Sequence, residues 1–380
     1  MTPGILKIVF QSIKFYKKPV LYQVLIIALL SAVITWSLMT GSSVRASLRK
    51  SSSERLGNTG IMISSGVRYF DVSLAERMKN SAKINCTGIL EIKGYSQSMI
   101  SQKGAYNTHI YAVNHDFFSF HGHDSIRIKP GEIAVNNKLA NYLGLQPGDE
   151  LIIRFKEISD IPSDAPFAPA KGTGKSVVMK VGTILEPYII GNFSLSISHI
   201  MPMNIFMNLS DLEDTYGNTK KINRLLIENK NDLSANDIYT DLKHELKLSD
   251  IGLKLRNIKN TGEIELTSER VFIDEILNKE IEKLLPSSAP VLTYLGNRLK
   301  TDSRSTPYSF ISALPSSLYP TIAQDNGIII NTWLAEDLQV TKGDTIKVFW
   351  YSPDSLNKLI ENSNKFIVKG IVDMKGIWSD

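Results

Sequence analysis

Histidines clustered between positions 115 and 123 are the first residues whose types suggest chemistry. The candidates for a metal site are His115, Asp116, His121, His123 and Asp124. Imidazole and carboxylate groups are common ligands of zinc and other divalent metals. However, this spacing does not place two histidines on one helix face, and His121-Gly-His123 follows an apolar run. We therefore expect a solvated loop there and no metal site.

A second candidate is Lys171–Ser176, whose sequence KGTGKS ends like a phosphate-binding loop. Such a loop needs a first glycine five positions before Gly174, where the chain has Pro169. It also needs a helix after the motif, so that the helix N-terminus faces the phosphates. The following residues, VVMKVGTIL, are typical of a strand instead. We therefore expect no nucleotide binding and no bound cofactor here.

Serine hydroxyls near a histidine are the third candidate, because that pairing is used in nucleophilic catalysis. Ser194, Ser196 and Ser198 precede His199 in the alternating stretch NFSLSISHI, which predicts a strand, and the chain has no GxSxG elbow. Glu263 and Glu265 also alternate, as on a solvated strand face. No acid–base pair assembles, so we predict no catalytic residue and do not expect an enzyme.

Charge and cysteine content exclude further classes. Residues 1–41 contain four lysines and no acids, so the 43 basic residues leave 39 after Gly41 against 38 acidic ones. A nucleic-acid partner needs a basic face, and this balance provides no surplus to build one. The single cysteine, Cys86, excludes an intrachain disulfide and any CxxC-type zinc or redox site.

An uncharged run of 21 residues, Val20–Thr40, predicts a transmembrane helix over residues 20–41. At about 1.5 Å per residue it spans about 30 Å, the thickness of a bilayer's hydrocarbon core. Tyr22 and Trp36 lie near its ends, where amphipathic rings favour the interface. A buried soluble helix and a cleaved signal peptide are the alternatives. A signal peptide has a shorter apolar core and small residues at its cleavage site, where this chain has Arg45.

The segment before the span, residues 1–19, mixes apolar residues with four lysines at helical spacing. This predicts a cytoplasmic helix on the membrane surface, with lysines near anionic lipid headgroups and a bend at Pro19. Basic residues also follow the span, from Arg45 to Arg55, so charge alone nearly balances the two orientations. The 339 residues after Gly41 contain no second span.

Two distant segments resemble one another without a gap, at an offset of 195 residues: Ile133–Phe155 and Ile328–Trp350. Each reads as a strand, a short helix capped by an asparagine, a glycine turn and a second strand. A later strand follows each copy, Ser176–Leu185 and Lys365–Val372, in which we match Gly182 with Gly370. We expect Leu139 and Leu334 to be buried and Asp149 and Asp344 to be exposed turn residues.

These patterns predict an α+β fold with one N-terminal transmembrane helix and a large extracytoplasmic domain at residues 42–380. Its two β-rich lobes are expected around 130–190 and 325–375, with a helical region around 208–285 between them. Apolar spacing predicts helices within Leu233–Leu248 and Thr267–Leu285. Loops are expected at Ser159–Gly174 and Pro286–Asp325.

In this order of segments, and in several motifs, the chain resembles the N-terminal part of MacB/FtsX-like ABC transporter permeases. The pattern NxxLAxxLG(L/V)xxGD is present from Asn136 to Asp149. The segments that also resemble the family are GSSVR at Gly41–Arg45, SLR at Ser47–Arg49, RLG at Arg55–Gly57, VNHDFFSF at Val113–Phe120 and RSTPYS at Arg304–Ser309.

The resemblance implies a MacB-like periplasmic core domain on a permease of the bacterial inner membrane, with a cytoplasmic N-terminus. It implies a separate ABC ATPase subunit, a homo- or heterodimer of permease chains, and a periplasmic or outer-membrane partner. In this family ATP hydrolysis moves the extracytoplasmic domain, and the cargo differs between members. Further spans follow this domain in the family, whereas the sequence here stops at Asp380, as expected of a fragment or of a split or truncated permease. The alternative is a membrane-anchored extracytoplasmic binding or scaffolding module that acts without an ATPase.

Overall fold

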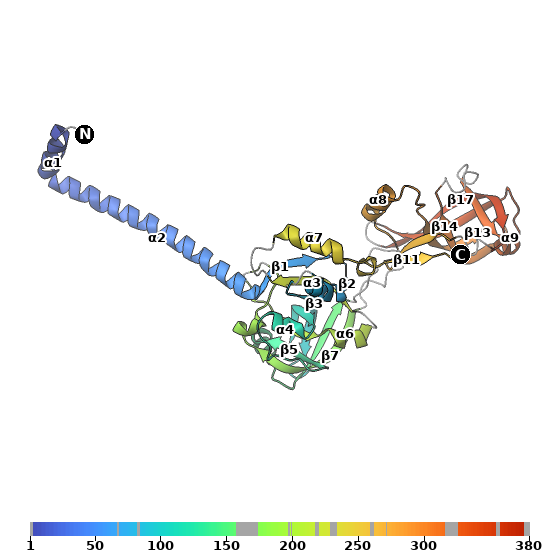
Figure 1. The fold of residues 1–380 in the computed structure, drawn as a ribbon, viewed down its shortest axis with the longest axis horizontal. Coiled ribbons are helices and arrows are strands. Elements are labelled where there is room, and N and C mark those ends of the chain that lie inside the picture. Colours follow the sequence, from blue (N-terminus) through green and yellow to red (C-terminus); the bar gives the residue numbers. More distant parts are fainter. Residues whose placement is uncertain are drawn as a thin grey trace.

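The computed structural model describes residues 3–66, 68–81, 84–156, 174–196, 198, 200–216, 220–228, 234–258, 262–270, 272–315, 326–354 and 358–375. A long N-terminal helix leads into a β-rich first lobe, and a smaller β-rich second lobe lies at the other end of the molecule (Figure 1). The protein is thus a mixed α+β fold, as the sequence predicts, and among the described residues one helix, near the N-terminus, is long and apolar enough to cross a membrane.

The N-terminal part consists of α1 (Pro3–Phe15) and α2 (Lys17–Leu56). Helix α2 has 40 residues, none of them buried, and its length and hydropathy suit a membrane crossing. At about 1.5 Å per residue it is about 60 Å long, twice the hydrocarbon thickness. The predicted bend at Pro19 is wrong: the chain turns at Tyr16 (φ −95°, ψ 40°). Pro19 fits the first turn of α2, where a backbone N–H has no partner within the helix.

The first lobe is an eight-stranded sheet in the order β1-β10-β3-β4-β8-β5-β7-β6. Strand β6 also pairs with β3, so β3, β4, β8, β5, β7 and β6 form a closed ring, and β10 and β1 extend it. The strands are β1 (Thr59–Ser64), β3 (Cys86–Ser98), β4 (Gly104–Val113), β5 (Glu132–Asn136), β6 (Glu150–Lys156), β7 (Gly174–Leu185), β8 (Asn204–Asn208) and β10 (Arg224–Glu228).

Two apolar clusters fill the first lobe. The larger one joins residues of the ring to α3 (Ser73–Ser81), α5 (Asn137–Leu143), α6 (Leu209–Tyr216) and α7 (Ala235–Glu245). The other is aromatic and brings Phe117, Phe118 and Phe120 of α4 (Asp116–Phe120) against Phe193 and Phe206. A π-helical turn, Pro187–Gly191, closes this cluster beside Phe193.

Small elements connect the lobes. They are the strand pair β2 (Phe70–Asp71) and β9 (Lys221–Ile222), a 3₁₀ turn at Leu248–Ile251, the hairpin β11 (Leu253–Asn257) and β12 (Ile264–Ser268), and α8 (Glu275–Leu284). The helices that the sequence predicts within Leu233–Leu248 and Thr267–Leu285 are confirmed, because α7 and α8 lie inside these ranges. The helical description of residues 208–285 is nevertheless too simple, because β9, β10, β11 and β12 also lie there.

The second lobe is a five-stranded sheet in the order β14-β13-β16-β17-β15. Its strands are β13 (Leu292–Lys300), β14 (Ser305–Ala313), β15 (Gly327–Asn331), β16 (Thr345–Pro353) and β17 (Leu359–Val372), with α9 (Thr332–Leu338) packed on one face. The predicted loop at Pro286–Asp325 is therefore wrong over most of its described length, where β13 and β14 form an antiparallel pair. The predicted loop at Ser159–Gly174 lies outside the described residues, except that Gly174 begins β7.

The internal repeat is confirmed at the level of local structure. In each copy a strand leads into a seven-residue helix, and a returning hairpin follows, giving β5-α5-β6-β7 and β15-α9-β16-β17. Asn136 caps α5 by accepting from the Leu139 N–H, and Asn331 caps α9 by accepting from the Leu334 N–H. In both copies the last strand runs parallel to the first and antiparallel to the middle one.

The glycine turns of the two copies also agree. Gly148 and Gly343 have φ of 101° and 102°, which a residue with a Cβ rarely adopts. The Gly148 N–H donates to Val181 O, and the Gly343 N–H donates to Val368 O. Val181 therefore corresponds to Val368, so the predicted match of Gly182 with Gly370 is wrong by one residue.

The leucine prediction is confirmed, because Leu139 and Leu334 are both buried. The aspartate prediction is confirmed for Asp344, which is exposed, but Asp149 is half-buried. Each aspartate carboxylate accepts a backbone N–H three residues earlier, at Gln146 and at Thr341. The aspartates therefore close their turns, rather than merely facing solvent.

Candidate functional site

The base of helix α2 is the place where the apolar helix is fixed to the first lobe. The helix ends at Leu56, and Gly57 follows with φ 56°. Two contacts hold the last turn: the Ser194 N–H donates to Arg55 O at 3.2 Å, and Arg55 Nη1 donates to Ser198 O at 2.5 Å. The end of α2 is therefore hydrogen-bonded directly to the segment around Ser194.

That serine segment is not the predicted strand. Its described residues from Asn192 to Ser198 form turns and bends. Ser194 Oγ lies within hydrogen-bonding distance of Ser196 Oγ, at 3.2 Å, and also accepts from the Ser196 N–H. His199 lies outside the described residues. The serines thus shape a loop that binds the end of α2.

The His121 side chain contacts the backbone where the chain changes direction after α2. Asn58 donates twice to this region, from its N–H to His121 Nδ1 at 3.1 Å and from Nδ2 to Phe120 O at 2.9 Å. A Cβ placed on Gly57 would lie 2.3 Å from His121 Nδ1, so only glycine fits there without displacing the ring. The imidazole therefore fixes the direction in which the chain leaves the helix.

The predicted solvated loop at His121 is wrong, because its side chain is buried against aromatic rings. Its ring centroid lies 4.7 Å from that of Phe117, 4.8 Å from Phe120 and 5.2 Å from Phe193. Burial first, and the neighbouring His123 second, lower the pKa of His121 to about 3. At neutral pH the ring is uncharged, and since Nδ1 accepts from Asn58, its proton is on Nε2.

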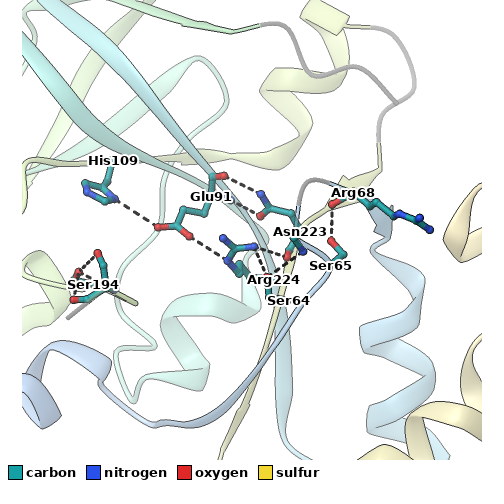
Figure 2. Close-up of polar contacts among 10 residues, drawn as sticks. Ser64, Ser65, Arg68, Glu91, His109, Ser194, Asn223 and Arg224 are labelled. Carbon is teal, nitrogen blue, oxygen red and sulfur yellow. Dashed lines mark hydrogen bonds and ion pairs between the residues drawn. The ribbon is translucent and has the colours of Figure 1, made fainter. Parts of the chain in front are cut away.

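A charged cluster lies on the neighbouring strands, with Glu91 of β3 at its centre (Figure 2). Arg224 Nε of β10 donates to Glu91 Oε2 at 3.1 Å, and His109 Nδ1 of β4 lies 3.5 Å from Glu91 Oε1. Asn223 bridges the backbone of Glu91, accepting from its N–H and donating to its carbonyl. Arg224 Nη1 also donates to Ser64 Oγ of β1 at 2.8 Å. The cluster therefore ties β1, which follows α2 in the chain, to the ring.

Burial alone would raise the pKa of Glu91, but the neighbouring His109 and Arg224 outweigh it and lower the pKa below its usual range. Burial also raises the pKa of Tyr111, directly opposite Glu91 on β4, well above its ordinary value, and the Glu91 charge adds to this effect. The carboxylate thus stays ionised and Tyr111 stays neutral. Neither group is tuned for proton transfer near neutral pH.

An open pocket lies beside this cluster, lined by Met62, Glu91, Lys93, Leu195, Ser196 and Arg224. It joins the serine segment at the base of α2 to strands β1, β3 and β10. Its carboxylate is already held by Arg224. The pocket's composition, with two cations and two apolar side chains, suits binding rather than acid–base chemistry.

The other candidates from the sequence do not meet at this place. Asp116 pairs with Lys79 and accepts from Thr87 Oγ1. It does not join His121 in a group that could bind a metal. The described residues contain no group of three or more His, Cys, Asp or Glu side chains that could hold a metal. Residues 171–173 lie outside the described part of the chain, while Lys175 and Ser176 belong to β7, paired with β6. The helix that a phosphate loop requires is therefore replaced by a strand.

Comparisons with known proteins gave matches among solved structures. No family model matches the chain, and no curated protein matches it. The chain is similar to the crystal structure of the periplasmic region of MacB from Actinobacillus actinomycetemcomitans, with 9% identity, 61% of this chain and 95% of that chain covered, and a TM-score of 0.33. It is also similar to the extracellular domain of the noncanonic ABC-type transporter YknZ from Gram-positive bacteria, with 9% identity, 46% and 78% covered, and a TM-score of 0.28.

Proposed function

We propose that this chain is a membrane subunit of an ABC transporter of the MacB/FtsX type, whose outer domain is moved by helix α2. The observation that carries the proposal is the continuity of α2, which runs from the apolar span to Leu56 as one helix of 40 residues. The part after Thr40 adds 16 residues, about 24 Å beyond the span. A tilt or shift of the span therefore reaches the first lobe without an intervening hinge.

The base of α2 supports this role, because it is attached rather than loosely linked. Arg55, Asn58 and Ser194 form hydrogen bonds between the helix end and the lobe. A flexible tether would need none of these contacts. The positive φ of Gly57 and the buried His121 ring add a fixed exit direction. We infer that the junction works as a rigid coupling between span and lobe.

The orientation that we propose has the N-terminus in the cytoplasm and the lobes outside it, across the bacterial inner membrane. Helix α1 would then lie on the cytoplasmic surface, with its lysines near anionic headgroups. We propose a separate ABC ATPase subunit on that side, a second permease chain, and a periplasmic or outer-membrane partner. The motifs that resemble MacB/FtsX-like permeases support these assignments. We propose that the chain contributes binding surfaces rather than catalysis.

Affinity purification from membranes of the native organism tests the proposal. The tagged chain should bring with it an ABC ATPase, and the isolated complex should hydrolyse ATP. The matched control is a tagged variant that combines Arg55→Ala with Asn58→Ala. It should retain the ATPase, because both changes lie outside the part of the chain that we place in the cytoplasm. Recovery of envelope proteins with no ATPase would instead favour the anchored scaffolding module.

A further inference from the structure

The second-lobe sheet carries three lysines side by side on neighbouring strands. Lys300 of β13 is paired with Lys347 of β16, and Lys347 is paired with Lys365 of β17. Directly opposed residues on adjacent strands point to the same face, with Cβ atoms about 4.5–5.5 Å apart. We call Lys300, Lys347 and Lys365 the lysine row.

Strand alternation places the lysine row on the face opposite the core. Leu299, Ile346 and Val348 are buried under α9 and flank the lysines in sequence. Since successive side chains point to opposite faces, the row projects away from that core. In agreement, Lys300 and Lys365 are exposed and Lys347 is half-buried.

The charge of the row is not compensated within the part of the chain that the structure describes. No acidic side chain there forms an ion pair with any of its three lysines. Glu361, the acid nearest along β17, pairs with Arg298 at 3.5 Å and accepts from Asn297 Nδ2. Like charges directly opposite one another destabilise a sheet. Repulsion within the lysine row therefore lowers the stability of the free protein. Such a loss of stability is expected where residues are kept for binding a partner.

An aromatic ring adjoins the row and adds an apolar contact. Phe349 lies two residues after Lys347 and directly opposite Arg298. Arg298 Cζ lies 4.3 Å, and Lys347 Nζ 5.0 Å, from the centroid of the Phe349 ring. Arginine and aromatic side chains are enriched in protein–protein interfaces. The face thus carries the lysine row and Arg298, and of these four cations Arg298 and Lys347 approach the ring.

We propose that this face docks a protein partner that presents a row of carboxylates. Charge complementarity supports an acidic partner, and the ring among the cations suits a protein surface with a mixed apolar and acidic patch. An anionic membrane surface is the less favoured partner, because the second lobe lies at the opposite end of the molecule from α1 and the apolar part of α2 (Figure 1). The proposal does not depend on an ATPase, so it stands apart from the transport function.

Binding of poly-L-glutamate to the full chain in detergent tests the proposal, with the polymer standing in for an acidic protein surface. Lys300→Gln, Lys347→Gln and Lys365→Gln combined should weaken binding about tenfold, because three exposed ion pairs with the polymer are lost and each contributes only modestly. The control combines Lys342→Gln, Lys358→Gln and Lys375→Gln, the same change of charge at scattered positions of the second lobe, and should leave binding within about twofold. Equal losses in both variants would overturn the proposal.

Two further measurements keep the outcome decisive. The row variant should melt at a higher temperature than the wild type, because the repulsion is removed, whereas the control should not. A lower melting temperature would contradict the claim that the row is retained against stability. If vesicles of phosphatidylglycerol bind in a row-dependent way and poly-L-glutamate does not, the partner is a membrane and the proposal of a protein partner is wrong.

Discussion

His121 shows at the residue scale how a side chain near the base of α2 depends on distant parts of the chain. Its Nδ1 accepts a hydrogen bond from the N–H of Asn58, 63 positions earlier, and its ring packs on Phe193, 72 positions later. The sequence around His121 shows only a histidine after an apolar run, which is why a solvated loop was expected. The apolar run itself was a usable signal, because Phe117, Phe118 and Phe120 build the aromatic cluster.

Acid should destabilise the protein through His121. Its folded-state pKa is about 3, below the ordinary value of 6.5. Between these values the unfolded chain binds a proton that the folded chain does not, so the free energy of unfolding falls as the pH drops below 6.5. The loss is about 1.4 kcal/mol per pH unit. Above 6.5 both states are neutral and the effect vanishes.

The variant His121→Asn isolates this contribution, because its amide oxygen can accept from the Asn58 N–H and does not titrate. Urea unfolding at pH 7 and pH 5 should show a smaller loss of stability in the variant, by about 2 kcal/mol. His115→Asn, at an exposed position outside the cluster, serves as the control. Equal losses in the wild type and in His121→Asn would show that the imidazole is not held neutral.

The two capping asparagines are a second residue-scale comparison. Asn136 is buried, and its side chain accepts from the Leu139 and Asn204 N–H groups and donates to Pro202 O. Asn331 accepts from the Leu334 N–H and lies nearer to solvent. One local pattern in the sequence predicts both caps. The extra bonds of Asn136 cannot be predicted from that pattern, because their partners lie in a segment about 66 residues later.

Replacing these asparagines by alanine should therefore have unequal effects. Asn331→Ala should cost about 1 kcal/mol, the usual loss of a helix cap. Asn136→Ala should cost about 2–4 kcal/mol, because it also leaves buried backbone groups without partners. Hydrogen exchange followed separately in peptides of the two lobes measures both. A larger loss of protection in the second lobe would contradict the assigned hydrogen bonds.

At the element scale, the junction between α2 and β1 is the feature on which the proposed coupling depends. Gly57→Ala places a Cβ against His121 at a positive φ, so the ring or the backbone must move. We expect a cost of about 1–3 kcal/mol, from strain in the left-handed region and a weakened Asn58 contact. Gly41→Ala is the control, because a Cβ there meets nothing within 4 Å and alanine favours a helix.

Thermal unfolding in detergent measures the effect of these glycine changes. Gly57→Ala should lower the melting temperature, and Gly41→Ala should leave it unchanged or raise it slightly. If Gly57→Ala were as harmless as Gly41→Ala, the chain would leave α2 in a direction other than the one that Gly57 and His121 define.

The elements also show where periodic patterns succeed and fail. The repeat was predictable because its caps, apolar helix positions and glycine turns are all local in sequence. The pair of β13 and β14 was missed, since Ser and Pro residues in 286–325 suggested a loop. The aromatic and β-branched residues in LTYLGNRLK and STPYSFISA, which favour strands, were the signal that could have identified them. The one-residue error between Gly182 and Gly370 arose because pairing, rather than residue identity, sets the register.

At the scale of the whole molecule, the α+β class and the single apolar helix followed from the sequence, while the closed ring of the first lobe did not. The ring depends on the pairing of β3 with β6 and of β4 with β8. These partners come from segments about 60 to 100 residues apart, so no local pattern specifies them. The charged cluster around Glu91 was missed for the same reason, because it is assembled from β3, β4 and β10.

Labelling of a cysteine placed at the base of α2 tests the central claim most directly, namely that ATP-driven movement of the span reaches the outer lobe. Burial raises the pKa of Cys86 to about 11, so this native thiol contributes little background. In intact cells, a membrane-impermeant maleimide should label Ser196→Cys but not Tyr16→Cys, which lies before the span. The labelling rate of Ser196→Cys should change several-fold when cellular ATP is depleted, and Gly57→Ala should reduce that response. Labelling of Tyr16→Cys from outside would reverse the orientation, and a rate at Ser196→Cys that is independent of ATP would contradict the coupling.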